Sequence, residues 1–107
     1  MISFEDFKKM ELRIATVKDV QDHPDADRLY VLRVEISEGE TKQVVAGIKK
    51  YYSKEELLEK QVVIVNNLEP ALLRGVESQG MLLAGSDENG LALITPEKKL
   101  ISGSTVK

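Results

Sequence analysis

Apolar and polar residues alternate along several short segments of this chain, and such a pattern predicts β-strands. Residues 11–20 begin in this way, because Leu12 and Ile14 fall on one face. Val17 and Val20 break the alternation. We therefore expect a long first strand that bends, as a strand does when it serves two sides of a small barrel.

Two more strands follow a turn at residues 22–28, which is rich in aspartate. Residues 29–36 alternate cleanly, and residues 42–48 return after a hairpin turn at residues 37–41. Residues 3–9 predict a short helix, with Phe4 and Phe7 as core anchors and Ser3 as its cap.

One clear helix is predicted over residues 51–60. Ser53 is a good N-cap, and the helix dipole favours the acidic residues in the first turn that follows it. Leu57 and Leu58 would dock on the sheet.

The apolar residues 61–65 predict a buried fourth strand, and residues 81–84 predict a fifth. A turn at residues 87–90 lets residues 91–95 pair back. Five short strands with a helix between the third and fourth form the order of an OB-fold barrel, an all-β class. With 107 residues, one domain spanning 1–107 is expected.

The loop between the fourth and fifth strands is unusual in composition. It carries apolar residues (Leu72, Leu73 and Val76) among glycine, proline, asparagine and arginine. Such a loop either only pins itself to the barrel or forms a folded-back functional surface, and the residues alone favour neither. In OB-folds this loop and the face of strands two and three bind ligands.

Charge and composition exclude several classes. The net charge is −3, which argues against binding nucleic acid through bulk positive charge and leaves room only for a local basic patch. No cysteine is present, no apolar run could span a bilayer, and no signal peptide is apparent, so a cytoplasmic protein is expected.

Catalytic and cofactor motifs are also missing from the sequence. The only histidine, His23, is best explained as a turn or capping residue, and the aspartates beside it lack the pattern of a calcium loop. The glycines are too dispersed for a nucleotide fingerprint. We expect no enzyme activity of the domain itself, no cofactor and no metal.

Four segments together resemble the tRNA-binding domain family found in methionyl-tRNA synthetases, structure-specific tRNA-binding proteins and the CsaA chaperone. The segments are Phe4-Glu5-Asp6-Phe7 with Glu11-Leu12-Arg13-Ile14-Ala15, His23-Pro24-Asp25-Ala26-Asp27-Arg28-Leu29-Tyr30, Gln43-Val44-Val45-Ala46-Gly47-Ile48, and Asn67-Leu68-Glu69-Pro70 with Gly75-Val76-Glu77-Ser78-Gln79-Gly80-Met81. The similarity covers essentially the whole chain.

This resemblance implies an OB-fold barrel with a C-terminal β extension, a homodimer, and shape-based binding of the tRNA elbow without catalysis. Phosphate contacts are expected from basic side chains, ribose contacts from Ser78 and Asn67, and a base or sugar contact from Met81. The implied RNA-binding residues are Arg28, Arg33, Lys42, Asn67, Arg74, Ser78, Gln79 and Met81.

One segment departs from the family. Between Pro70 and Gly75, where lysines or arginines are common, only Arg74 is basic. The apolar residues beside it, Leu72 and Leu73, would also suit a CsaA-like export chaperone that binds unfolded polypeptide. A third possibility is a module that acts only through dimerisation. A methionyl-tRNA synthetase is a further expected partner.

Overall fold

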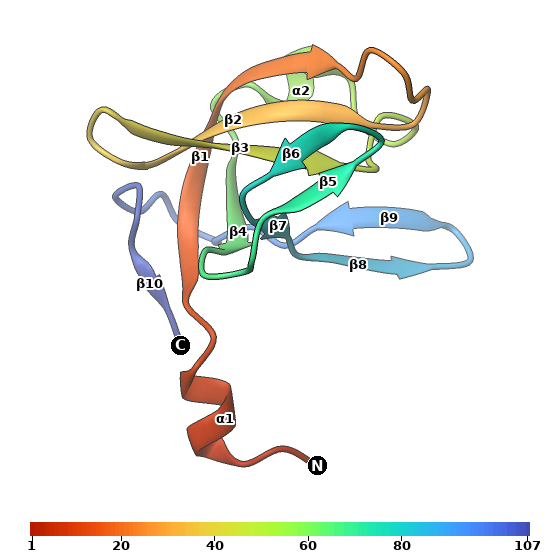
Figure 1. The fold of residues 1–107 in the computed structure, drawn as a ribbon. Helices are drawn as coiled ribbons and strands as arrows, with labels where there is room; N and C mark the ends of the chain where they lie inside the picture. Colours follow the sequence, from red (N-terminus) through yellow and green to blue (C-terminus); the bar gives the residue numbers. More distant parts are fainter.

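β1 (Leu12–Asp22) is the strand on which the sheet is built (Figure 1). In this computed structural model, which describes residues 1–107, the first half of β1 pairs antiparallel with β4 (Gln61–Val65). The second half pairs with β2 (Tyr30–Ser37). The register shifts between Val17 and Asp19, and a bulge of this kind bends a strand. The prediction of a long, bent first strand is confirmed.

Two more strands extend this sheet to the order β3-β2-β1-β4-β7. β3 spans Glu40–Ala46 and β7 spans Met81–Leu82. The sheet curls into a half-barrel, and α2 (Lys54–Leu57) connects β3 to β4 (Figure 1). The sequence predicted five strands with a helix between the third and fourth. The sheet of these five strands, with α2 between β3 and β4, confirms the predicted fold class.

α2 is shorter than the helix predicted over residues 51–60. Ser53 forms a capping box with Glu56, as its hydroxyl accepts from the Glu56 N–H over 3.2 Å and its own N–H donates to the Glu56 carboxylate over 2.8 Å. Leu57 is fully buried, as expected. Leu58 is 46% exposed, and the prediction that it docks is wrong, because the chain leaves the helix there and the next N–H donates to the Val17 carbonyl.

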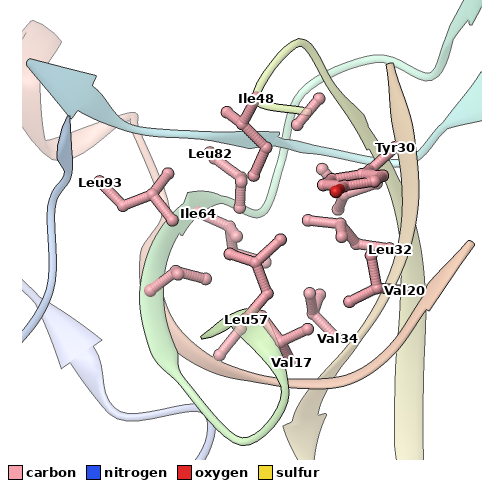
Figure 2. Packing of buried hydrophobic residues seen from close by; sticks show 14 residues of the cluster. Val17, Val20, Tyr30, Leu32, Val34, Ile48, Leu57, Ile64, Leu82 and Leu93 are labelled. Carbon is pink, nitrogen blue, oxygen red and sulfur yellow. The ribbon is translucent and has the colours of Figure 1, made fainter. Parts of the chain in front are cut away.

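The barrel interior holds one cluster of buried apolar side chains drawn from β1, β2, β3, β4 and β7, from α2, and from Ile48 and Leu93 (Figure 2). β4 is apolar on both faces, because Val62 and Ile64 point into this core while Val63 and Val65 point outward. The outward pair joins a second cluster, which we call the outer cluster. It comprises Leu12, Ile14, Val63 and Val65, with Phe7, Leu83 and Val106 packed against it.

α1 (Phe4–Lys8) stands away from the sheet at the end where the C-terminus also lies (Figure 1). Ser3 caps it by accepting a hydrogen bond from the Asp6 N–H over 3.0 Å. Phe7 is half-buried against the outer cluster. Phe4 is 72% exposed, so the prediction that it anchors the core is wrong. A helix this short, lying beyond the sheet, has only one face that can reach a cluster.

The loop after β4 contains a hairpin that sequence periodicity did not predict. β5 (Ala71–Leu73) pairs with β6 (Val76–Ser78) as a separate two-stranded sheet. The turn residues Arg74 and Gly75 both have positive φ, at 52° and 88°. Positive φ at both central residues is typical of the type I′ turn, which suits tight hairpins.

The C-terminal part forms a second hairpin and a returning strand. β8 (Ala84–Asp87) pairs with β9 (Gly90–Leu93), as the turn at residues 87–90 predicted. β10 (Thr105–Val106) then pairs with the start of β1. This last pairing gives the barrel its C-terminal β extension and covers part of the outer cluster.

Candidate nucleic-acid interface

The segment after β6 closes the barrel against the edge of β3. The Gln79 N–H donates to the Gln43 carbonyl over 2.8 Å, and the Gln43 N–H donates to the Gln79 side-chain oxygen over 2.8 Å. The Gln43 side chain in turn donates to the Glu77 carbonyl. A side chain thus replaces the backbone of a neighbouring strand and satisfies an edge that would otherwise be open.

We call this closure the seam and define it by Gln43, Ser78 and Gln79. Ser78 is its buried part, at 2% exposure. Its hydroxyl accepts from the Val45 N–H over 2.9 Å and donates to the Gly80 carbonyl over 2.7 Å. Gly80 is itself close to the backbone, since a Cβ there would lie 2.9 Å from the Val65 carbonyl oxygen. The hydroxyl of Ser78 therefore holds the loop on the barrel and is not open to a ligand in this structure.

Arg28 and Arg74 are brought together from distant parts of the sequence. Arg74 lies at the tip of the β5–β6 hairpin, and its guanidinium donates to the Asp25 carbonyl over 3.2 Å. Both arginines are exposed and line one shallow cleft of about 440 Å³. The cleft is lined by Asp25, Ala26, Asp27, Arg28, Leu29 and Arg74.

Arg33 and Lys42 occupy neighbouring strands but opposite faces. Arg33 of β2 is exposed and lies opposite Gln43, on the outer face. Lys42 of β3 lies opposite Val34, whose side chain is in the core. The Lys42 ammonium reaches the end of β4 and donates to the Asn66 carbonyl over 2.7 Å. Only Arg33 of this pair shares the outer surface with Gln43 and the seam.

Asn67 ties the segment after β4 to the segment before β1. Its side-chain oxygen accepts from the Glu11 N–H over 2.9 Å, and its amide donates to the Lys9 carbonyl over 2.7 Å. The neighbouring Asn66 amide donates to the Glu11 carboxylate and lowers the pKa of that group, and the Arg13 guanidinium lowers it further. The Asn67 side chain is exposed, but both of its polar ends already have partners in the chain.

Met81 is half-buried and lies opposite Val65 in the register of β4 and β7. Cross-strand partners share a face, so Met81 belongs to the outer side of the sheet, with the outer cluster. Met81 does not line the cleft of Arg28 and Arg74. The structure therefore brings only part of the predicted residues together.

Charged side chains also fix the start of the turn that carries Arg28. The Asp22 carboxylate lies 3.1 Å from the ammonium groups of both Lys49 and Lys54. Hydrogen bonds from these two lysines lower the pKa of Asp22 below its ordinary value. This three-residue contact joins the end of β1 to the start of α2.

Two residues of this region were not predicted as parts of a site. Gln43 completes the seam, and only the pairing with Gln79 shows it, because neither residue is unusual in its own strand pattern. His23 caps its own turn, as predicted, but its second ring nitrogen also contacts the Leu73 carbonyl of the hairpin. No local sequence pattern indicates a contact between residues this far apart in the chain.

No group of three or more histidine, aspartate or glutamate side chains is placed to hold a metal ion. No helix is long and apolar enough to cross a membrane.

Comparison with known proteins shows the family. A family model described as "Putative tRNA binding domain" matches residues 12–105. This chain belongs to that family. It is a binding-domain family, and the chain is related to methionine–tRNA ligases and to CsaA.

Two curated relatives of this tRNA-binding domain are methionine–tRNA ligases. The methionine–tRNA ligase of Pyrococcus furiosus is 56% identical over 106 residues, and that of Thermococcus onnurineus is 53% identical over 106 residues. Each alignment covers 99% of this chain and 14% of the ligase. The chain therefore spans only a small part of the length of these relatives.

Solved structures share the whole fold of the domain. The chaperone CsaA from Bacillus anthracis superposes with a TM-score of 0.91 at 31% identity, covering 100% of this chain and 99% of CsaA. A MetRS-related protein from Pyrococcus horikoshii superposes with a TM-score of 0.91 at 30% identity, covering 100% and 98% of the two chains.

Proposed function

We propose that this domain binds the elbow of tRNA by shape, without catalysis, through a surface at the hairpin end of the barrel. We call this the hairpin surface and define it by Arg28, Arg33 and Arg74 with Gln79. The observation that carries the proposal is the meeting of Arg28 and Arg74 in one cleft, although they come from separate loops. Paired guanidiniums suit phosphate oxygens, and phosphate contacts position a protein on folded RNA.

The remaining predicted residues take other places in this proposal. Ser78 and Asn67 hold the loop and the N-terminal segment, and Lys42 holds the Asn66 carbonyl, so they shape the surface rather than face RNA. Met81 lies on the side of the outer cluster and would meet only an RNA that extends around the barrel.

Aspartates line the same cleft, and the chain is acidic overall. Binding should therefore be focal and strongly dependent on salt, because it relies on few phosphate contacts. Recognition of a folded RNA by shape needs little base contact and is compatible with the shortage of exposed aromatic side chains.

The test is tRNA binding by fluorescence anisotropy at several salt concentrations. Arg74→Ala and Arg28→Ala should each weaken binding on the order of three- to tenfold and reduce the salt slope by roughly one contact. Lys98→Ala is the matched control, since it removes the same charge from an exposed position that does not line the cleft of Arg28 and Arg74. Equal loss in Lys98→Ala, or no tRNA binding at low salt, would contradict the proposal.

A homodimer is the second part of the proposal. Met1, Ile2, Phe4 and Met10 are exposed around α1. A groove of about 570 Å³ runs beside them, and Val106 of the C-terminal strand lines it. A second copy covering this face would hide the apolar side chains and bring two hairpin surfaces into one particle, which raises avidity.

Light scattering tests the dimer directly. The wild-type chain should have about twice the mass of one chain. Phe4→Asp should shift it to a monomer and weaken tRNA binding, while Glu5→Lys on the same short helix serves as a charge control. A wild-type mass of one chain at micromolar concentration contradicts this part.

The similarity to methionine–tRNA ligases supports a role for the domain with that enzyme, as a part or as a subunit, in the cytoplasm. Added to a ligase that lacks such a domain, the chain should lower the tRNA concentration needed for half-maximal aminoacylation. An unchanged requirement for tRNA would count against this role.

One observation favours a second function, the binding of unfolded polypeptide. Leu72 is 72% exposed on the same hairpin, and Leu68 is 46% exposed before it. A CsaA chaperone is among the structures that share this fold. If polypeptide is the ligand, the domain should suppress aggregation of a denatured test protein, and Leu72→Asp should abolish that effect while leaving tRNA binding unchanged.

A further inference from the structure

His23 is the only histidine of the chain, and it is 5% exposed. It directly follows β1, at the start of the turn that carries Arg28. Its Nδ1 accepts a hydrogen bond from the Asp25 N–H over 2.9 Å. Its Nε2 lies 2.9 Å from the Leu73 carbonyl oxygen of the β5–β6 hairpin. Both ring nitrogens therefore have partners, one within the turn and one in a distant element.

These partners determine the state of the ring. A carbonyl oxygen can only accept, so Nε2 carries the proton. A backbone N–H can only donate, so Nδ1 keeps its lone pair. The ring is thus the neutral Nε2–H form. Protonating Nδ1 would place two N–H groups against each other and remove the bond to Asp25.

The Leu73 bond lies near the tip of the hairpin, beyond the hydrogen bonds that join the hairpin to β3. β5 and β6 form their own two-stranded sheet, and those bonds are made at Glu77, Ser78 and Gln79. At the tip, His23 donates to Leu73 and Arg74 donates to the Asp25 carbonyl. Two hydrogen bonds, one donated by the turn and one donated by the hairpin, thus join the turn to the tip of the hairpin.

Arg74 itself has φ 52°, a conformation that is uncommon for a non-glycine residue. The His23 bond acts on the residue immediately before it. Charged groups around this contact are Asp22, Asp25, Asp27 and Arg28 of the turn, with Arg74 of the hairpin. The imidazole of His23 lies buried beside these exposed charged groups.

We propose that His23 is a positioning residue for the RNA contact: its neutral imidazole holds the hairpin on the turn and keeps Arg74 beside Arg28. This rests on the proposed function of the hairpin surface. His23 does not touch the RNA. It acts through Arg74, and the ordering of the hairpin before binding lowers the entropy cost of the complex.

Two substitutions separate the two bonds of the ring. In His23→Asn the side-chain oxygen takes the place of Nδ1 and accepts from Asp25, but the side chain is too short to reach Leu73. In His23→Gln the amide nitrogen reaches toward Leu73, while the acceptor for Asp25 is lost. His23→Asn should weaken tRNA binding on the order of five- to tenfold, whereas His23→Gln should stay within about twofold of wild type.

The double variant His23→Asn with Arg74→Ala should bind no more weakly than Arg74→Ala alone, because the two residues act through one contact. Wild-type affinity in His23→Asn, or full additivity in the double variant, would overturn the positioning role. Thermal unfolding confirms that each variant is folded. If His23→Asn does not fold, tRNA binding of His23→Gln is compared with wild type, and a loss well beyond about twofold overturns the positioning role.

Two measurements need no RNA. Nitrogen-15 NMR of the single imidazole should show the neutral Nε2–H form at pH 7, and amide exchange in β5 and β6 should be faster in His23→Asn than in His23→Gln. A proton on Nδ1, or equal exchange, overturns the proposal. If these results hold but wild type binds no tRNA, the proposed function fails and the RNA role of His23 fails with it, while the tie itself stands.

Discussion

Ser78 shows how a single side chain decides whether the loop after β4 is part of the barrel. Its hydroxyl takes the place of a strand partner for Val45 and satisfies the Gly80 carbonyl. Because the site is 2% exposed, water cannot replace either bond in a variant that lacks the hydroxyl. The small polar side chain thus stabilises the closure on which the hairpin surface depends.

Ser78→Ala should therefore lower the free energy of unfolding by about 2 kcal/mol, since it leaves a buried N–H and a buried carbonyl without partners. Urea denaturation followed by circular dichroism measures the change. Ser86→Ala, at an exposed position in β8, is the control and should change stability by less than about 0.5 kcal/mol. A Ser78→Ala midpoint equal to that of the control would show that the seam does not depend on the hydroxyl.

At the scale of elements, the C-terminal extension is held on the sheet by a close backbone contact. The Gly103 N–H donates to the Ile14 carbonyl over 2.6 Å, and Gly103 has φ 92°. Ser102 adds a hydroxyl that lies 2.7 Å from that of Thr16 and donates to the Glu35 carboxylate. β10 can then pair with the start of β1 and cover the outer cluster.

Gly103→Ala should loosen this extension, because a Cβ there would collide with the Ile36 carbonyl oxygen. We expect a loss of stability of about 2 kcal/mol or more, from the clash together with the positive φ. Amide exchange should rise first at Thr105 and Val106. Gly85→Ala is the matched control, as a Cβ at that position meets nothing within 4 Å. Unchanged exchange at β10 in Gly103→Ala would refute the expectation.

For the whole molecule, acid stability depends on carboxylates that join distant elements. The pKa of Asp22 is lowered in the folded state by hydrogen bonds from Lys49 and Lys54. A lowered folded-state pKa contributes stability above the unfolded-state value of about 4, and this contribution is lost as the pH falls through the folded-state pKa. Asp22 is half exposed, so its share is modest.

Asp22→Asn should therefore lower stability at pH 7, by less at high salt because salt screens the ion pairs in wild type, and should reduce the loss of stability that occurs below about pH 4. Thermal unfolding from pH 2.5 to 7, at low and high salt, measures this. Asp87→Asn, in the β8–β9 turn and without an ion pair, is the control. Parallel pH profiles for wild type and Asp22→Asn would contradict the assignment.

Much of the architecture could be predicted from local patterns. The alternation in residues 29–36, the apolar β4 and the cap at Ser53 depend on near neighbours, so they appear correctly in the sequence. Phe4 and Leu58 were predicted wrongly because their burial depends on whether a sheet lies beside a short helix. Local spacing does not contain that information.

The sequence by itself determined the order of strands and helix, and with it the fold class and the loop most suited to a ligand. Only the tertiary structure decided what that loop presents. It placed Ser78 in a buried seam, Lys42 and Arg33 on opposite faces, and Arg74 beside Arg28 through His23. The physical reason is distance along the chain: these contacts join residues far apart in sequence, and their partners become neighbours only when the barrel closes.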